Sequence, residues 1–182
     1  EVNAFEPVKE ITKFLKYSNK VNIQIHHEAL SNSVGEQIIE IPKFKSESLI
    51  SLSSLSYSGE LPTVKRNVNI LSLDYFGFKD VDLIKIDVEG HEDFVVEGAL
   101  ETIKRCKPFL IIEIELRHRA KDIDFLVERL KNLNYKCFFC RNKKKLIPYE
   151  NFKADVDQNI ELFGKDIQSK CQYINNFIFI PH

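Results

Sequence analysis

The sequence of 182 residues has no methionine and no tryptophan, and it has only six glycines, six prolines and four cysteines. Because translation begins at methionine, a chain without one is expected to have lost its original amino terminus, through cleavage of a leader or truncation of the gene. A chain of this length can bury a sizeable core without disulfides, and so few cysteines fit a reducing compartment. We therefore expect a cytoplasmic protein.

Long hydrophobic runs are also absent. The longest apolar stretches, such as residues 109–112, are far shorter than the ~18 to 20 residues that cross a bilayer, and residues 1–13 lack a signal-peptide pattern. The 26 basic residues are matched by 27 acidic ones, which excludes a domain-wide basic surface for DNA or RNA. We expect neither a membrane nor a nucleic acid as a partner.

Cys137 and Cys140 form a Cys-x-x-Cys pair that has two interpretations. Phe138 and Phe139 lie between them, and the segment has the composition of an apolar strand, which favours structural cysteines. A zinc or redox pair is the alternative, but no second close cysteine pair or His-x-x-His completes a metal site. We therefore expect the four thiols to be structural, and we expect no bound metal at this pair.

Helical and strand periodicities alternate along most of the chain. The expected helices are 7–17, 72–76, a helix from residue 92 that Pro108 ends, and 123–133. The expected strands are 2–5, 21–25, 37–41, 64–70, 81–86, 109–114, 135–140 and 176–180. This order predicts one α/β domain over residues 1–182, with a mostly parallel Rossmann-like sheet, helices on both faces and a β excursion at about 32–70. The strand 81–86 is expected to be central, because it is apolar on both faces.

Two carboxylates follow the first two expected strands, at the sheet edge where α/β folds bind their ligands. Glu6 stands where a carboxylate can accept both ribose hydroxyls of an adenosine-containing cofactor, either a nicotinamide dinucleotide or S-adenosylmethionine. Glu28 can accept the adenine amino group while the amide of Ala29 meets the adenine ring. The alternatives are a helix cap for Glu6 and a solvated strand end for Glu28.

The strongest signal is Asp87-Val88-Glu89-Gly90-His91-Glu92, which directly follows the expected central strand. Four ionisable residues surround one glycine, and Gly90 permits a turn or a close approach that a side chain would block. This density of charge at the ligand-binding edge predicts a functional site. A capped, solvated turn is the alternative.

This block, preceded by Ile84-Lys85-Ile86 and followed by Gly98-Ala99 and a strand at 108–115, resembles the signature of FkbM-type S-adenosylmethionine-dependent methyltransferases. Other matching segments occur in the same order: Ala4-Phe5-Glu6-Pro7, Ala29-Leu30-Ser31, Leu73-Asp74 and residues 176–181. The resemblance covers nearly the whole chain. It implies a class I methyltransferase fold, S-adenosylmethionine as the cofactor, and a small-molecule or glycan hydroxyl, on a sugar, polyketide or similar metabolite, as the acceptor.

The chain departs from the family at its start. The family begins with a strand and an Asp-x-Gly-x-Asn-x-Gly-like loop that holds the methionine part of the cofactor, and no segment of this sequence supplies them. Together with the missing methionine, this predicts an N-terminally incomplete chain, with truncation favoured. The resemblance implies that the absent strand is central, between the strands that end at Glu6 and at Asp87. Its loss leaves two unpaired edges or forces those strands to pair.

Two other functions stay open at this point. A truncated Rossmann-like domain that binds no cofactor is the alternative to an enzyme. A nicotinamide-dependent enzyme gains nothing over a methyltransferase, because its Gly-x-Gly-x-x-Gly fingerprint is likewise absent.

Methyl transfer to a hydroxyl requires alignment of the acceptor oxygen and a group that manages its proton. Asp87 is the first candidate for this general base or for positioning the acceptor, and Glu89 and His91 are the alternatives on the same turn. Neighbouring parallel strands lie about 4.8 Å apart, so Glu113, after the next strand, can come within reach of Asp87. Such a pair can raise one pKa or bind a divalent cation. Lys85 is expected to balance these charges, with a direct catalytic role as the alternative.

Overall fold

The computed structural model describes residues 1–17, 22–44, 47–48, 53–56, 61–118, 122–141, 145–159, 161 and 173–182. The strands are β1 (Val2–Phe5), β2 (Ile23–His26), β3 (Ala29–Leu30), β4 (Gly35–Phe44), β5 (Glu47–Ser48), β6 (Thr63–Leu71), β7 (Leu83–Ile86), β8 (Phe109–Glu113), β9 (Tyr135–Arg141), β10 (Lys145–Pro148) and β11 (Asn176–Pro181). The helices are α1 (Lys9–Tyr17), η2 (Leu73–Phe76), α2 (Glu92–Glu97), α3 (Leu100–Cys106), η3 (Leu116–His118), α4 (Ile123–Lys131), η4 (Tyr149–Asn151) and α5 (Ala154–Asp157).

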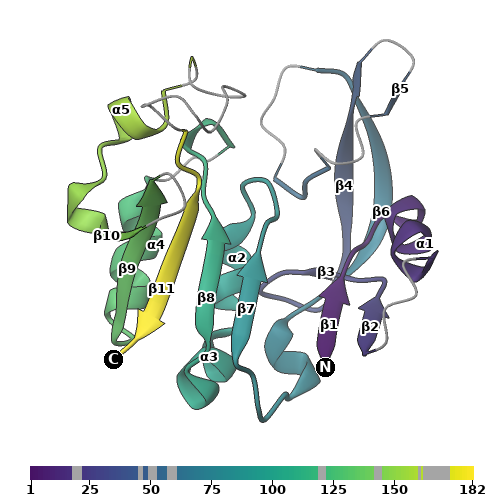
Figure 1. Ribbon diagram of the computed structural model, residues 1–182. Coiled ribbons are helices and arrows are strands. Elements are labelled where there is room, and N and C mark those ends of the chain that lie inside the picture. The colour runs from purple at the N-terminus through teal and green to yellow at the C-terminus, as the bar shows by residue number, and fades with distance from the viewer. Residues whose placement is uncertain are drawn as a thin grey trace.

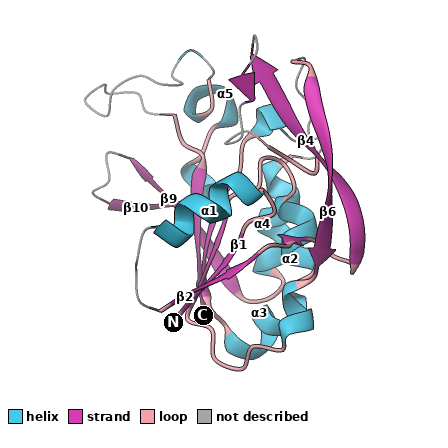
Figure 2. Cartoon of the chain, turned by 90° about the vertical axis from the view of Figure 1, so that its right-hand side faces the viewer, coloured by secondary structure: helices cyan, strands magenta, loops and turns pink. Residues whose placement is uncertain are grey.

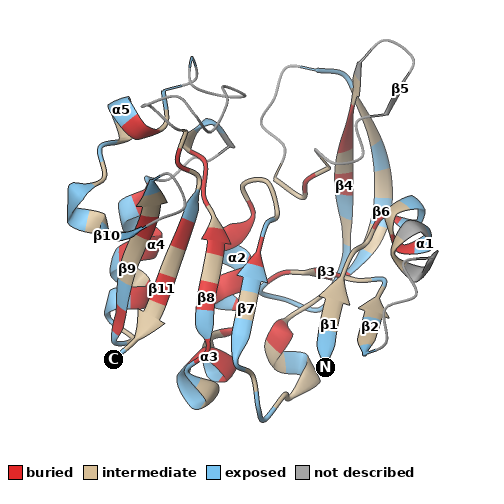
Figure 3. Ribbon diagram, in the orientation of Figure 1, coloured by how far each residue is buried: buried red, intermediate tan, exposed pale blue. Residues whose placement is uncertain are grey.

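A five-stranded sheet in the order β10-β9-β11-β8-β7 organises the C-terminal part of the chain (Figure 1). Apolar residues at every second position place Leu110 and Ile112 of β8 beside Phe179 and Phe177 of β11, and all four side chains are fully buried. Helices α2, α3 and α4 cover this face (Figures 1 and 2). Figure 3 shows the resulting stripes of buried residues along β8 and β11. Burying each such side chain contributes about 1.5–3 kcal/mol, so this layer is the main core.

A second sheet, in the order β3-β6-β4-β5, projects from the N-terminal part of the chain (Figure 1). Its long strands β4 and β6 pair in antiparallel register from Gly35↔Ile70 to Pro42↔Thr63. Val8, directly before helix α1, forms a small apolar cluster with Ile39 and Ile41, and Ile11 of α1 packs against this cluster. Residues 45–46, 49–52 and 57–60 of the expected excursion lie outside the described residues.

The first two strands form a separate parallel pair, β1-β2, in which Phe5 lies opposite His26. The two rings stack with their centroids 4.5 Å apart. In the described part of the chain, β1 pairs with β2 alone and β7 pairs with β8 alone. Among the described strands, β1 and β7 therefore each have one edge without a partner strand.

The sheets are mixed, so the expectation of a mostly parallel sheet was wrong. Of the eight pairings between described strands, three are parallel and five are antiparallel. The antiparallel pairings are β4 with β5 and β6, β11 with β8 and β9, and β9 with β10. A period of two in the sequence carries no information on strand direction, which is why it could not reveal this.

Three further expectations are corrected. Strand β7 is an edge strand in the described part of the chain, and Leu83 is 54% exposed. The described helices beside the five-stranded sheet lie on one of its faces rather than on both (Figure 2). The helix expected from residue 92 is split into α2 and α3 by a turn at Gly98 and Ala99. Strand β10 was not expected, because its four residues include Lys145 and Pro148.

The ends of η2 match the sequence signals. The Ser72 hydroxyl accepts a hydrogen bond from the Tyr75 amide, and Gly77 ends the helix in a left-handed conformation at φ 62°. Among the described residues, every helix is too short or too polar to cross a lipid bilayer.

Candidate functional site

A cavity of about 340 Å³ lies where the carboxyl ends of β1 and β7 approach each other. Its walls come from residues 3–7, 29–30, 53–55 and 84–88, with single side chains from Ile39, His91 and Val95. Most of the lining is apolar, and the ionisable side chains among it are Glu6, Lys85, Asp87 and His91. The cavity therefore combines an apolar interior with a few charged groups, which is typical of small-molecule sites.

Glu6 forms one wall of the cavity directly after β1. Its Oε1 accepts a hydrogen bond of 2.7 Å from the Val8 amide, at the start of α1. Burial raises the pKa of the Glu6 carboxyl, and the bond from Val8 partly opposes this effect. The carboxylate therefore caps the start of the helix, as one interpretation expected, and also lines the cavity; the ribose contact stays a prediction.

Ala29 and Glu28, at the next strand, differ in their relation to the cavity. Ala29 is buried in β3, opposite Ile70 of β6, and lines the cavity. Glu28 is half-buried and is not among the residues that line it. The structure therefore brings Glu6 and Ala29 to one cavity and leaves Glu28 outside its lining.

The acidic turn, Asp87 to Glu92, begins at the end of β7. Two consecutive residues have positive φ angles, 49° at Glu89 and 92° at Gly90, so a glycine is favoured here for the conformational reason expected from the sequence. The Gly90 amide donates a 2.8 Å hydrogen bond to Glu92 Oε1, and the Ser54 hydroxyl donates one of 2.7 Å to the Glu89 carbonyl. These bonds fix a backbone conformation that few residues adopt.

His91 is 3% exposed and uses both of its ring nitrogens. Nε2 lies 3.0 Å from Ser31 Oγ, Nδ1 lies 2.7 Å from Ser56 Oγ, and the ring stacks on Phe94. Burial lowers the pKa of His91 from its ordinary 6.5 to about 4, while the charge of Asp93 acts weakly in the opposite direction. The imidazole is therefore neutral at pH 7 and holds two serine hydroxyls.

Asp87 and Glu113 meet across the parallel pair β7–β8. Their carboxyl groups share a hydrogen bond, and Lys85 Nζ lies 3.2 Å from Asp87 Oδ2 and 3.8 Å from Glu113 Oε2. Burial raises the pKa of Glu113, and Asp87 raises it further, to about 8. The pair expected from strand spacing is thus present, with Lys85 between its charges.

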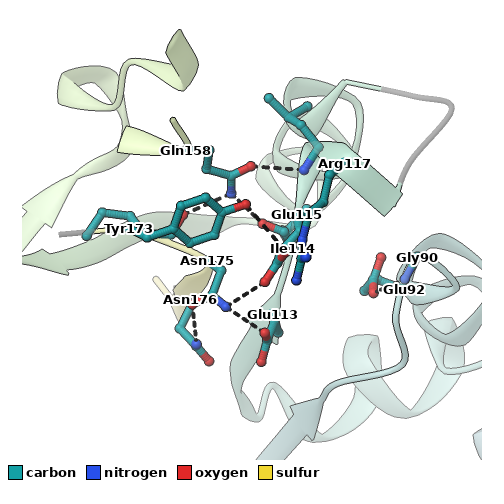
Figure 4. A network of polar contacts seen from close by, with 12 residues as sticks. Gly90, Glu92, Glu113, Ile114, Glu115, Arg117, Gln158, Tyr173, Asn175 and Asn176 are labelled. Carbon is teal, nitrogen blue, oxygen red and sulfur yellow. Dashed lines mark hydrogen bonds and ion pairs between the residues drawn. The ribbon is translucent and has the colours of Figure 1, made fainter. Parts of the chain in front are cut away.

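A polar network continues from Glu113 along the sheet edge (Figure 4). Asn175 Nδ2 donates to Glu113 Oε1 at 2.6 Å and to Glu115 Oε1 at 2.9 Å. Glu115, which is 5% exposed, pairs with Arg117 and accepts a hydrogen bond from the Tyr173 hydroxyl. Figure 4 shows Asn175 placed between the two carboxylates. The network orients Glu113 from the side opposite to Asp87.

Glu89 lies near the carboxylates of Asp87 and Glu115 and is not among the residues that line the cavity. Burial raises the pKa of its carboxyl, and the nearby charges of Glu115 and Asp87 raise it further. Its backbone carbonyl, rather than its carboxylate, makes the contact with Ser54. The described residues contain no group of His, Cys, Asp and Glu arranged to hold a metal ion.

Sequence reasoning missed the hydroxyls and amides around the site, namely Ser31, Ser54, Ser56 and Asn175. The serines lie in or beside a Ser-rich stretch with no periodicity, and Asn175 is 62 residues from Glu113 along the chain. No local signal marks such partners.

Among the described residues, the cysteines do not line the cavity. Cys106, Cys137 and Cys140 are free thiols, and Cys171 lies outside the described residues. Cys137 and Cys140 are three positions apart on β9, which directs them to opposite faces of the strand. The Cys-x-x-Cys spacing therefore does not bring the two thiols together.

Comparisons with known proteins agree with this geometry. A family model described as the methyltransferase FkbM domain matches residues 1–137. The fold is similar to the crystal structure of methyltransferase FkbM from Methylobacillus flagellatus KT, with a TM-score of 0.56 at 15% sequence identity. That alignment covers 98% of this chain and 36% of the other, so this chain spans about a third of the protein it matches. No curated protein matches the sequence.

Proposed function

The chain belongs to the FkbM methyltransferase family, and from this premise we propose that it binds S-adenosylmethionine in the cavity between β1 and β7. We further propose that it transfers the methyl group to a hydroxyl of a sugar, polyketide or similar metabolite. The observation that carries the proposal is the convergence of Glu6 and Asp87 on one cavity at the carboxyl ends of two strands. The free thiols support a reducing compartment, and we propose the cytoplasm.

The residues present suit the adenosine half of the cofactor. The cavity of about 340 Å³ falls within the usual range of small-molecule sites, roughly 300–1,000 Å³. Leu30, Ile39 and Val95 supply apolar surface for a base, and the Glu6 carboxylate supplies an acceptor for ribose hydroxyls. The sequence contains no glycine-rich loop for the methionine half. We propose that a strand and loop supplied ahead of residue 1 pair with the open edges of β1 and β7 and border the cavity at the carboxyl ends of these strands.

When bound, S-adenosylmethionine would supply a sulfonium methyl group for transfer to the acceptor oxygen, with the neutral thioether as the leaving group. Asp87 would hold the acceptor hydroxyl and take its proton. Glu113 carries the shared proton of the pair at neutral pH, because its pKa is raised to about 8, and donates a hydrogen bond to Asp87. Asp87 is favoured over His91 as the base, because both imidazole nitrogens are engaged.

Calorimetry tests the cofactor assignment. S-adenosylmethionine and its demethylated product are titrated into the 182-residue chain and into an N-terminally extended form that supplies the strand and loop. We expect micromolar binding by the extended form and weak or no binding by the chain alone. A failure of the extended form to bind either ligand would refute the proposal.

The alternative, a non-catalytic domain, is favoured by the engagement of Glu6 Oε1 with the Val8 amide, because this bond occupies a carboxylate oxygen that a ribose would need. It predicts no binding by either form. The same titration therefore distinguishes the two functions.

A further inference from the structure

The segment of residues 53–56, described here as the serine segment, connects the excursion to the acidic turn. Ser54 pairs with Glu40 of β4 through two backbone hydrogen bonds of 2.9 and 3.0 Å, and its side chain is buried. Ser54 Oγ accepts from the Ser56 amide at 2.9 Å and donates to the Glu89 carbonyl at 2.7 Å. One hydroxyl thus shapes the serine segment and also holds the acidic turn.

Ser56 makes the second connection, to His91 Nδ1 at 2.7 Å. On the far side of the imidazole, Nε2 contacts Ser31 Oγ, and Ser31 Oγ donates a long bond of 3.5 Å to Asn32 Oδ1. A hydroxyl has one proton to give, so Ser31 accepts from Nε2–H. A neutral imidazole then has Nδ1 as its acceptor, and Ser56 is the donor. The hydrogen bonds run in one direction, from Ser56 through His91 to Ser31.

The two connections enclose the strained part of the acidic turn. Glu89 and Gly90 have positive φ angles; Glu89 carries the carbonyl held by Ser54, and Gly90 lies between it and His91, whose imidazole is held by Ser56. Such backbone is maintained only where the surroundings determine it. Asp87 lies two residues before Glu89, so its position beside Glu113 depends on how the turn is held.

We propose that Ser54, Ser56 and His91 are positioning residues, which hold the acidic turn so that Asp87 stays beside Glu113 at the cavity. The inference rests on the proposed function, because it is the methyl-transfer reaction that uses Asp87. It gives the excursion a role in the site, since β4 positions Ser54 through Glu40. Neither Ser54 nor Ser56 acts on a substrate in this account.

The test uses the isosteric pair Ser56→Thr and Ser56→Val in the 182-residue chain, because only threonine keeps the hydroxyl. The side-chain carboxyl of Glu113 is titrated by carbon NMR. In the parent chain we expect Glu113 to titrate near 8, because burial and the charge of Asp87 raise its pKa. Release of the turn lets Asp87 move away and water enter, so Ser56→Val should lower the pKa of Glu113 by at least about one unit, a tenfold loss of proton affinity. Ser56→Thr should restore it.

Nitrogen NMR of His91 gives a second readout that needs no ligand. The parent chain should show a protonated Nε2 and an acceptor Nδ1, and the Nδ1 resonance should move in Ser56→Val. If Ser56→Val does not fold, Ser56→Ala takes its place in both measurements. An unchanged Glu113 titration in the folded valine or alanine variant, or a proton on Nδ1 of the parent, would overturn the inference.

Different measurements refute the positioning role of the serines and the proposed function. Absence of cofactor binding by the extended form removes the proposed function, while the Glu113 titration still decides whether the serines position Asp87. In the extended form, Ser56→Val should also lower kcat about tenfold and leave the affinity for S-adenosylmethionine within about twofold, because a displaced base weakens chemistry more than binding.

Discussion

The carbonyl oxygen of Ser31 occupies the space in which a Cβ at Gly98 would have to lie. This contact explains why residue 98, at the turn between α2 and α3, is a glycine, although its backbone has an ordinary right-handed conformation. The same serine holds Nε2 of His91 on its side-chain face. Close packing of Ser31 on Gly98 therefore fixes Ser31, the end of the Ser56–His91–Ser31 series of hydrogen bonds that lies farthest from Ser56.

Gly98→Ala should destabilise the protein by about 1–3 kcal/mol, because the backbone of Ser31 must move to admit the methyl group. Urea unfolding measures the change. Gly77→Asn is the matched control, since Gly77 is left-handed, has nothing within 4 Å of an added Cβ, and asparagine tolerates this conformation. A larger cost at position 77 than at position 98 would contradict the packing argument.

Arg141 and Asp157 should respond unequally to substitution. Arg141 Nη2 lies 2.7 Å from Asp157 Oδ1, and the arginine side chain is 42% exposed whereas the aspartate is 4% exposed. Arg141→Leu leaves a buried carboxylate without its cation and should cost about 3 kcal/mol. Asp157→Asn leaves the cation near water and retains an acceptor for the Lys153 amide, so it should cost about 1 kcal/mol. Equal losses in thermal unfolding would show that burial of the carboxylate is not the dominant cost.

His91 should make the protein less stable as the solution becomes more acidic. Its pKa is lowered to about 4 in the folded state and returns to about 6.5 on unfolding, so the unfolded chain binds the proton first. Stability is retained above pH 6.5 and is lost progressively down to about pH 4, by roughly 3 kcal/mol in all. Urea unfolding of the parent and of His91→Gln isolates this contribution as the difference between their pH profiles. Direct NMR titration of His91 near 6.5 would contradict it.

Glu113 should make the protein less stable as the solution becomes more alkaline. Its pKa is raised to about 8, so the folded state retains a proton that the unfolded chain releases near 4.5. The stabilising contribution of the protonated carboxyl is complete below 4.5 and is lost as the pH rises through about 8. In Glu113→Gln the amide donates to Asp87 at every pH, so this loss should disappear from unfolding curves compared at about pH 5 and about pH 9. If Glu113→Gln loses as much stability between these two pH values as the parent does, Glu113 is not the group that titrates.

Asp87→Asn should reduce methyl transfer much more than cofactor binding. Loss of a general base typically costs about 10²- to 10⁴-fold in rate, whereas we expect the affinity for S-adenosylmethionine to change less than about threefold. Turnover and calorimetry of the extended form measure the two quantities. Asp82→Asn is the matched control, because Asp82 is exposed at the opposite end of the same strand. Unchanged turnover in Asp87→Asn would refute the assigned role.

The parts of the site that the sequence predicted are those that follow from strand order. Glu6 and Asp87 each follow a strand, and α/β folds bind their ligands at the carboxyl ends of strands. In the described part of the chain β1 and β7 lie in separate sheets, yet their carboxyl ends border one cavity. Glu113 could be paired with Asp87, since β7 and β8 are parallel neighbours joined by helices. Local pattern was therefore sufficient for the first carboxylates.

The remaining partners depend on contacts that no local pattern records. The hydroxyl of Ser56 reaches His91 from a Ser-rich stretch without periodicity, and Asn175 reaches Glu113 from the other end of the chain. Gly98 lies within a helical pattern that continues on both sides, and the contact that leaves room only for glycine there comes from Ser31, far away in sequence. The direction of β11 was likewise hidden, since side-chain alternation is the same for parallel and antiparallel strands.

The open edges of β1 and β7 give the cavity a property that its side chains do not. In the described part of the chain, each strand turns one row of amide and carbonyl groups away from its only neighbour, toward the space that the cavity occupies. A molecule or segment placed there meets a row of backbone hydrogen-bond donors and acceptors, whose spacing is set by strand geometry rather than by residue identity. Side-chain substitutions along these strands can change the affinity for a ligand, but they leave the spacing of the backbone groups unchanged.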